Sequence, residues 1–357
     1  MAVSQSLEQV RAMPSKDAYP ASSRMLDLLV CACGIWFVFG LYLDGWAHNQ
    51  RLVDSFFTPW HAVLYSGFLA VALTIGITQV RNMWHGYSMM RALPKGYLLS
   101  LVGIVMFALA APFDLLWHEV FGFEENIEAL LSPSHLLLAT GAILAVGGPL
   151  RSAIRRSRSR TLQGWRDLLP VVLSLFLLYA VISFFTQYAH PLANHHLMVR
   201  RVNIEPFFTD IQGIFSAFLP TIMLMCLIFL GLRFWQLPFG TVTLLLGGGM
   251  TAFYLMRIRA ASGFWYIVLI AFVVGLLADG FIARFKPSIN HVRALRWLAF
   301  GLPFGFFLSV YVADILLRGM VWKIHMWLGV SILCGVLGLG LSYIFAPPFQ
   351  HLPDDRD

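Results

Sequence analysis

The sequence contains little charge. Asp, Glu, Lys and Arg together make up 12% of its 357 residues, whereas 59% are hydrophobic. A soluble domain carries about 25% charged residues, so this composition excludes an ordinary soluble globular protein. It predicts an all-α fold, a polytopic integral membrane helical bundle. Helices satisfy their own backbone hydrogen bonds in the lipid bilayer, which is the predicted main partner of the chain.

Cysteine is also scarce. The four cysteines, Cys31, Cys33, Cys226 and Cys334, fall within apolar runs, and no two form a CxxC motif or a pair in one loop. This pattern excludes a disulfide framework and a thiolate zinc site. We expect the cysteines to be small core residues.

Long apolar runs, by contrast, are abundant. A helix that crosses a hydrocarbon core of ~30 Å needs about 20 residues, and such windows predict about ten membrane spans. The spans lie near residues 25–46, 59–80, 96–118, 133–150, 167–189, 210–233, 237–256, 262–283, 295–317 and 325–345.

Lys and Arg are distributed by membrane side. They precede the first predicted span and recur in alternate loops, most densely in RSAIRRSRSR (residues 151–160). Because positively charged loops stay in the cytoplasm, both termini are predicted to be cytoplasmic, in the inner (cytoplasmic) membrane of a bacterium. The net charge of +7 is explained by this topology, so no nucleic-acid partner is predicted.

This topology divides the chain into five parts. They are a cytoplasmic tail (1–24), a four-span region with a duplicated hairpin (25–150), a basic cytoplasmic loop (151–166), a C-terminal membrane region of six spans (167–345) and a second cytoplasmic tail (346–357). The first tail lacks the apolar core and cleavage site of a signal peptide, so we expect the first span to be retained.

Two similar groups of ionisable residues lie about 70 residues apart, at the predicted outer ends of spans. The first trio is Asp44, His48 and His61, and the second trio is Asp114, His118 and His135. In each trio the aspartate and the first histidine are four residues apart, which places both on one face of a helix. The repeat predicts a duplicated two-helix hairpin whose two trios lie on the same side of the membrane.

The second histidine of each trio follows a helix-start signal. TPWH (residues 58–61) and SPSH (132–135) combine a capping hydroxyl with a proline, so both histidines fall in the first turn of a helix. The helix dipole there disfavours imidazolium, and a neutral imidazole can bind a metal ion. We therefore predict a metal site at each trio. The alternative is a duplication whose polar residues merely cap helices.

Gly67 and Gly141 follow His61 and His135 at the same offset. They would allow close approach of neighbouring helices.

At these residues the chain resembles the C subunit of the copper-dependent membrane monooxygenases that oxidise methane or ammonia. The resemblance covers about residues 40–145 and lies in D-x3-H-x12-H from Asp44, in FTPxH (57–61) and in the second trio one hairpin later. It implies that the first trio binds copper and that the second trio forms another copper site, although Asn is common in that family where this chain has Asp114. It also implies oxygen-activating chemistry in an assembly with other membrane subunits.

Ligand chemistry, taken alone, leaves the metal open. Two imidazoles and one carboxylate without a thiolate suit copper, zinc or non-haem iron better than calcium or magnesium. We expect copper, with iron and zinc as alternatives. The substrate is a small molecule that the sequence does not identify.

Other polar residues of the predicted outer side are candidates for further roles. The additional metal-ligand candidates are His190, His195, His196 and His325, and the candidate proton-handling residues of catalysis are Glu119, Glu124 and Glu125. Asp314 stands four residues before Arg318, so we expect these two to form an ion pair. Asp279 is expected to be satisfied by Arg284 or by the membrane interface.

The sequence supports one leading function and two alternatives. The leading hypothesis is a membrane metalloprotein with an outward-facing copper site, a monooxygenase-like oxidoreductase if it is an enzyme. The first alternative is a membrane protein of metal-ion transport or handling. The second alternative is a protein that binds haem or a quinone in the membrane.

Overall fold

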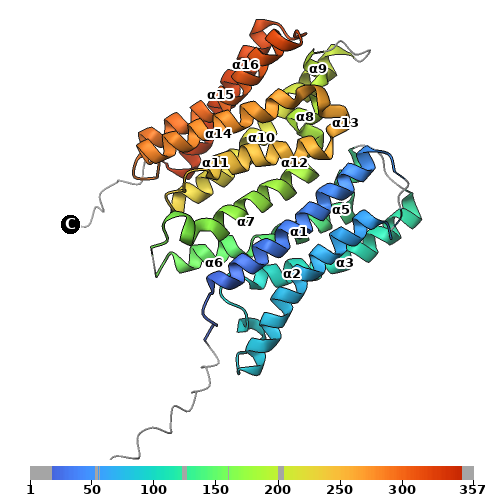
Figure 1. Cartoon of the computed structure of the whole chain (residues 1–357), viewed down its shortest axis with the longest axis vertical. Coiled ribbons are helices and arrows are strands. Elements are labelled where there is room, and N and C mark those ends of the chain that lie inside the picture. Colours follow the sequence, from blue (N-terminus) through green and yellow to red (C-terminus); the bar gives the residue numbers. More distant parts are fainter. Residues whose placement is uncertain are drawn as a thin grey trace, which may run out of the picture.

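Figure 1 presents the computed structural model, which describes residues 18–52, 55, 57–122, 127–159, 161–199 and 205–347. The regular elements of these residues are helices, arranged largely side by side. Nine of them are long and apolar enough to cross a membrane. The predicted all-α membrane bundle is therefore confirmed.

The long helices follow the predicted spans closely. They are α1 (Arg24–Asn49), α2 (Pro59–Trp84), α3 (Leu98–Phe121), α5 (Pro133–Val146) continued by α6 (Gly148–Arg156), α7 (Gly164–Phe185), α10 (Pro206–Phe234), α14 (Trp265–Phe285), α15 (Val292–Leu317) and α16 (Ile324–Phe345). Short elements connect them: α4 (Glu128–Leu131), α8 (Pro191–Asn194), α9 (His196–Val199), α11 (Thr241–Thr243), α12 (Gly249–Met256), α13 (Ile258–Ala261), and the segments η1 (Met89–Arg91), η2 (Gln187–Ala189), η3 (Leu244–Gly248) and η4 (Ser262–Phe264).

The helix found in the predicted span 237–256 is shorter than a full membrane crossing. The apolar segment Thr241–Met256, built from α11, the π-helix η3 and α12, extends about 24 Å at ~1.5 Å per residue. Its start is held by Asp279 of α14, which is buried and accepts hydrogen bonds from the backbone N–H groups of Val242 and Thr243, each at 2.9 Å. Asp279 thus caps a helix start, and the expected pairing with Arg284 or the interface is wrong.

The first four spans form two helix pairs, α1 with α2 and α3 with α5, each packed mainly on its own partner. Glycines allow this close contact. A Cβ atom at Gly67 would lie 2.6 Å from the Cα atom of Phe37, and one at Gly141 would lie 2.9 Å from the backbone nitrogen of Phe107. The two glycines hold matching places in the repeat, so the predicted duplicated hairpin is present in the fold.

Polar contacts hold α1 against its neighbours. Two residues before Asp44, the Tyr42 hydroxyl of α1 donates to the backbone oxygen of Ala180 in α7, at 3.0 Å. At the end where α1 begins, the buried carboxylate of Asp27 accepts from the Tyr97 hydroxyl at 2.6 Å and forms an ion pair with Arg156 of α6. These contacts fix the orientation of α1, which carries part of the first trio.

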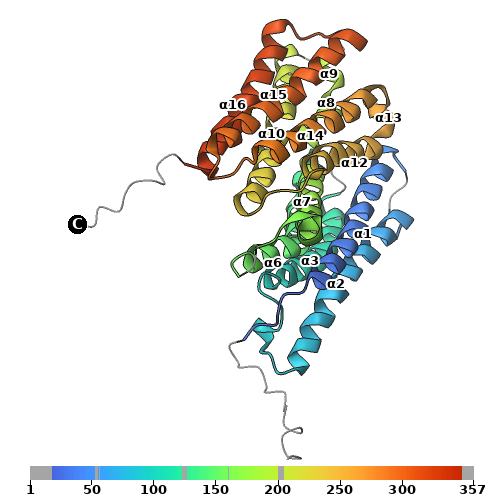
Figure 2. The ribbon, with the colours of Figure 1, turned by 60° about the vertical axis from the view of Figure 1, so that its left-hand side comes forward.

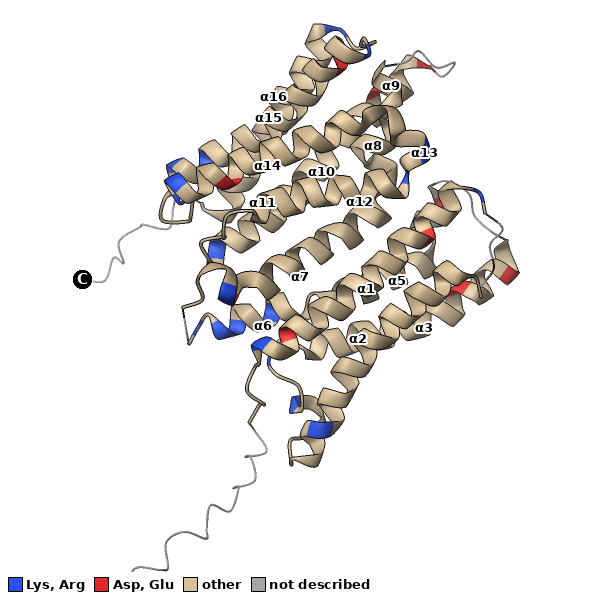
Figure 3. Ribbon diagram, viewed as in Figure 1, with Lys and Arg blue, Asp and Glu red and all other residues tan. Residues whose placement is uncertain are grey.

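The two ends of the bundle differ in charge. In Figure 3 most Lys and Arg segments lie at the lower left, around α6 and the adjacent helix ends, whereas acidic segments gather at the opposite ends of α1 and α3. The described chain begins at α1 and ends after α16 at this same basic end (Figures 1 and 2). Figure 2 shows the same arrangement from a second direction. The end with the acidic segments is called the acidic end below.

Candidate metal centres

The first trio converges where α1 ends and α2 begins. Asp44 and His48 lie one turn apart on α1, and His61 lies in the first turn of α2. The Nε2 atoms of His61 and His48 are 3.1 Å and 3.5 Å from the same Asp44 oxygen, Oδ1. One ligand atom from each residue lies within 4.8 Å of the other two. Since bonds of about 2.0–2.2 Å place two ligands of one ion at most ~4.4 Å apart, small side-chain shifts would let a single ion contact all three.

The second trio converges in the same way between α3 and α5. The His118 Nε2 atom is 3.5 Å from Oδ2 of Asp114, and the His135 Nδ1 atom is 3.6 Å from Oδ1 of the same carboxylate. The ligand atoms again lie within 4.8 Å of one another.

The His61 ring is oriented by its second nitrogen. Nδ1 lies 2.8 Å from the backbone oxygen of Ser55 and 3.0 Å from the Thr58 hydroxyl. A carbonyl oxygen can only accept, so Nδ1 carries a proton, and Nε2 is the nitrogen that faces Asp44. A backbone carbonyl that fixes the tautomer in this way is the usual outer-shell support of a metal-binding histidine.

The His135 ring is held differently. Its Nδ1 atom, the one that faces Asp114, also lies 2.7 Å from the Ser132 hydroxyl. Ser132 is the N-cap of α5, and its hydroxyl oxygen accepts from the backbone N–H of His135 at 3.4 Å. When the hydroxyl proton points to His135 Nδ1 and not to the Ser134 hydroxyl, 3.2 Å away, it competes for the lone pair that a metal would use. The two trios share residue types but differ in which imidazole nitrogen is presented.

The carboxylates of both trios lack a full set of partners. Oδ1 of Asp44 and Oδ1 of Asp114 are buried and make no hydrogen bond of acceptable geometry. A buried carboxylate oxygen without a partner is costly, and a cation between it and the imidazole nitrogens would supply one. The donor set of each trio thus fits a metal ion. His48 is the exposed member, with 55% of its side chain accessible, so the first trio is open on that side.

The remaining candidate residues are dispersed. Glu119 is exposed on α3, and Glu124 and Glu125 lie outside the described residues. His196 and His325 are exposed, while His190 and His195 are buried. Within the part of the chain that the structure describes, groups of three ligands close enough for one ion occur only at the two trios. None of these four histidines joins a group of three such ligands among the described residues, and their role as ligands stays a prediction.

His195 instead contacts Asp314. Its Nε2 atom lies 2.8 Å from Oδ1 of Asp314, and the Tyr266 hydroxyl donates to the same oxygen. Arg318 donates to the backbone oxygen of Gly263 and lies over the ring of Phe264. The expected Asp314–Arg318 pair is therefore wrong. The sequence carries no local signal for the real partners, because both come from distant helices.

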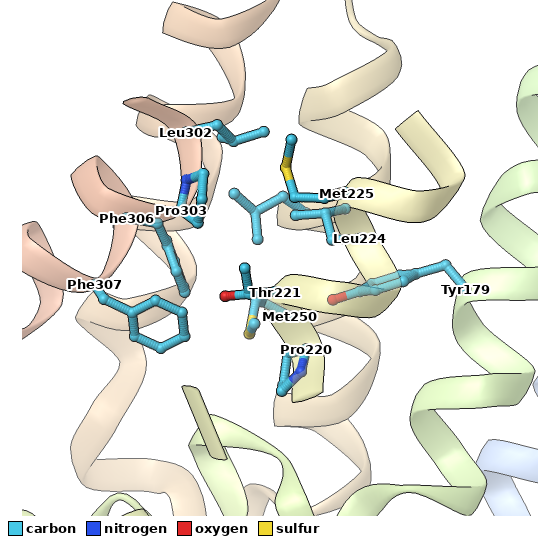
Figure 4. Close-up of a pocket in the computed structure, with 11 residues that line it drawn as sticks. Tyr179, Pro220, Thr221, Leu224, Met225, Met250, Leu302, Pro303, Phe306 and Phe307 are labelled. Carbon is cyan, nitrogen blue, oxygen red and sulfur yellow. The ribbon is translucent and has the colours of Figure 1, made fainter. Parts of the chain in front are cut away.

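The C-terminal half also contains a small apolar cavity, between α7, α10, α12 and α15 (Figure 4). Its volume is about 20 Å³, and its wall includes the helix prolines Pro220 and Pro303. A water molecule needs at least ~10–15 Å³ of such space, so the cavity is too small for an organic substrate. The two trios are therefore the stronger candidate sites.

Comparison with known proteins identifies no relative. No protein-family model matches the chain, and neither the curated proteins nor the solved structures contain a significant match. The function has to be argued from the geometry of the trios, because a shared fold class alone does not transfer a reaction.

Proposed function

We propose that this chain is a multi-pass metalloprotein of the bacterial cytoplasmic membrane that binds copper at both trios. The observation that supports the proposal most directly is the convergence of each trio, with its ligand atoms within 4.8 Å of one another. Two independent copies of one Asp–His–His arrangement, built by equivalent helix ends, are hard to explain as helix capping alone. Capping requires neither the shared carboxylate nor the repeated spacing.

Copper is the metal that suits the donors and their setting best. Two imidazoles and a carboxylate also accept iron or zinc, and these are the alternatives. In the proposed orientation the basic end lies in the cytoplasm, so both trios face the outside of the cell. An ion there would be supplied from the periplasmic side, through the exposed His48 in the first trio.

We further propose a monooxygenase-like oxidoreductase as the activity. Bound copper would supply redox chemistry toward dioxygen, and the protein would supply position and proton transfer. Glu119 follows His118 directly on α3 and is exposed, so it is the candidate that could carry protons between the second trio and water. The substrate class would be small and apolar or nitrogenous, and other membrane subunits would complete the assembly.

Metal transport is the alternative that the geometry disfavours. A transported ion needs ligands along its path through the bundle. Among the described residues, ligand groups occur at the trios alone, and both trios lie at the acidic end (Figures 1 and 3). This distribution suits a resident ion better than a passing one.

The metal content of purified variants tests the proposal. Copper, iron and zinc would be quantified by mass spectrometry in the wild type, in Asp44→Ala/His48→Ala, in Asp114→Ala/His118→Ala and in the combined variant. We expect each double variant to lose about half of the bound copper and the combined variant to lose nearly all of it. His85→Ala/His291→Ala is the control, because both histidines are exposed and belong to neither trio. Unchanged metal content in the combined variant would defeat the proposal.

A further inference from the structure

Arg257 lacks a carboxylate partner in the described structure. It lies between α12 and α13 with its side chain partly buried. Its Nε atom is buried without a hydrogen-bond partner, and no described carboxylate forms an ion pair with it. Burial lowers the pKa of the guanidinium from its usual value. Partly buried arginines are normally paired, so the Arg257 guanidinium has a charge and a hydrogen-bond donor that an anionic partner could use.

His190 provides a second donor close to the C-terminal end of α12. Its ring stacks on that of Phe253, with the ring centroids 3.5 Å apart. His190 is the N-cap residue of α8, which contacts both α12 and α13, the helices on either side of Arg257. His190 is 2% exposed, and its Nδ1 atom accepts a hydrogen bond from the backbone N–H of Leu192 at 3.2 Å. In the neutral ring the proton is therefore on Nε2, which is a donor.

The charge state of His190 is set by its surroundings. Burial, followed by the nearby charge of Arg257, holds the pKa of His190 well below its usual value. The ring is thus neutral at pH 7. Together the two side chains offer one positive charge, the guanidinium fork and one imidazole N–H, a set that matches the oxygens of an anion.

This pair lies beside the first trio. Met256, which precedes Arg257, packs on Gly45, which follows Asp44: a Cβ atom at Gly45 would lie 2.8 Å from the sulfur of Met256. In Figure 1 the end of α12 lies next to the end of α1, and Figure 2 shows the same from another direction. A ligand held by Arg257 and His190 would therefore be a neighbour of the first trio.

We propose that Arg257 and His190 form an oxyanion-binding site that takes a carboxylate or phosphate group. The site goes beyond the proposed copper function and does not require a metal. Bidentate contacts to the guanidinium and a third hydrogen bond from His190 Nε2 would bind the anion. A free anion and a phospholipid headgroup present the same chemistry, and the burial of His190 favours the free anion because lipid reaches only the surface of the bundle.

Phosphate-dependent stabilisation of the purified protein tests the site. Tm would be measured in detergent with rising inorganic phosphate, against sodium chloride of equal ionic strength, because a ligand of the folded state raises Tm by mass action. We expect saturable stabilisation of the wild type. Arg257→Gln should weaken the apparent affinity at least about tenfold, as the loss of a charged hydrogen bond implies, and Arg257→Lys should be intermediate. Arg259→Gln, at an exposed neighbouring arginine, should behave as the wild type.

Further variants make the test decisive. His190→Leu should also weaken phosphate binding, which provides a second readout if Arg257→Gln folds poorly. Asp44→Asn should keep the phosphate response, so that failure of the copper proposal and failure of the oxyanion proposal can be distinguished. Asp54 lies outside the described residues. A phosphate response that is absent from the wild type and appears in Asp54→Asn would mean that Arg257 is already paired, and would overturn the proposal.

Retained lipid separates the two sources of the anion. Native mass spectrometry of protein taken from phosphatidylglycerol nanodiscs would show a bound phospholipid in the wild type, lost in Arg257→Gln, if the headgroup is the ligand. Phosphate-dependent stabilisation without such a lipid would identify a free anion. Equal behaviour of Arg257→Gln and Arg259→Gln in both measurements would overturn the site itself.

Discussion

Phe37 and Phe107 meet edge to face, with their ring centroids 5.1 Å apart and an interplanar angle of 87°. Each stands seven residues before the aspartate of its own trio. They are equivalent positions of the repeat, and yet they contact each other. Direct contact between equivalent residues is the mark of two units related by a local two-fold axis, so the two hairpins form an internal dimer.

A second equivalent pair supports this symmetry. Asp27 and Tyr97, each seventeen residues before the aspartate of its trio, are joined by a hydrogen bond of 2.6 Å. The pair lies near the start of α1 and α3, whereas the phenylalanines lie further along these helices. Contacts at two levels indicate an axis that runs along the bundle. Such an axis leaves both trios at the same end of the bundle.

The close approach at Gly67 should be essential for the first hairpin. Gly67→Ala places a methyl group against the backbone of Phe37, and we expect a loss of about 1–3 kcal/mol in the free energy of unfolding, as overpacking usually causes. Gly76→Ala on the same helix meets nothing within 4 Å and should be neutral or stabilising by up to ~1 kcal/mol. Thermal unfolding in detergent would compare them. Equal effects of the two changes would show that the contact does not matter.

Most of the fold and the core of the site could be predicted from local patterns. Apolar runs give the helices their lengths, and the four-residue spacing with the Thr-Pro and Ser-Pro starts puts each trio at a helix end. These signals act over one or two turns, so the sequence contains them directly. The predicted span 237–256 is longer than the helix, which begins only at Thr241. A hydropathy window averages neighbouring residues, so it cannot include the capping of this helix by Asp279, which is distant in the sequence.

The partners of Asp314 could not be predicted in this way. The spacing of four favoured Arg318, but α15 ends at Leu317, and Arg318 has a non-helical φ of −128°. Its side chain therefore leaves the face on which Asp314 lies. His195 and Tyr266 reach Asp314 through tertiary packing of α8 and α14, which no local spacing specifies.

The Ser132 hydroxyl should weaken metal binding at the second trio. It contacts the His135 nitrogen that faces Asp114, so Ser132→Ala frees that lone pair. In a background with the first trio removed by Asp44→Ala/His48→Ala, we expect copper to bind about 2–10-fold more tightly, the value of one net hydrogen bond. Loss of the N-cap should cost about 1 kcal/mol of stability at the same time. Competition with a chelator of known affinity would measure the change in binding.

Thr58→Ala is the matched change at the first trio, and it should not strengthen binding. His61 keeps the Ser55 carbonyl as a partner for Nδ1, and Nε2 already faces Asp44. With the second trio removed by Asp114→Ala/His118→Ala, we expect less than about a twofold change in copper affinity, because the net worth of the remaining hydrogen bond is unchanged. Tighter binding in Thr58→Ala, or weaker binding in Ser132→Ala, would contradict the assignment of the imidazole nitrogens.

The buried Asp314 group should contribute strongly to stability. His195→Ala removes one partner and leaves a carboxylate that is 0% exposed with only the Tyr266 contact. Leaving a buried polar group without a hydrogen-bond partner costs about 1–3 kcal/mol. Arg318→Gln should change stability by less than about 0.5 kcal/mol, as for a surface substitution, because Arg318 does not pair with Asp314. Chemical denaturation would give the free energy of unfolding of both variants. A larger loss of stability in Arg318→Gln would indicate that Arg318 does pair with Asp314, as the spacing predicts.

His190 should make the stability of the protein fall in acid. Its pKa is held well below the usual value by burial and by Arg257, whereas in the unfolded chain a histidine titrates near 6.5. Above about pH 6.5 both states are neutral at this residue. Below about pH 6.5 this histidine is protonated in the unfolded state and stays neutral in the folded state. Unfolding therefore becomes more favourable by up to ~1.4 kcal/mol per pH unit until the pH reaches the pKa of the folded state.

His190→Gln isolates this contribution, because it removes the titrating group and leaves the other histidines in place. We expect the wild type to be the more stable protein at pH 7.5 and the gap between the two free energies of unfolding to narrow at pH 6.0 and again at pH 5.5. Denaturant titrations at the three pH values would measure it. A gap that stays constant with pH would mean that His190 titrates normally and is therefore open to water. A gap that widens in acid would mean that the folded state stabilises a charged ring, which is incompatible with a neighbouring unpaired Arg257.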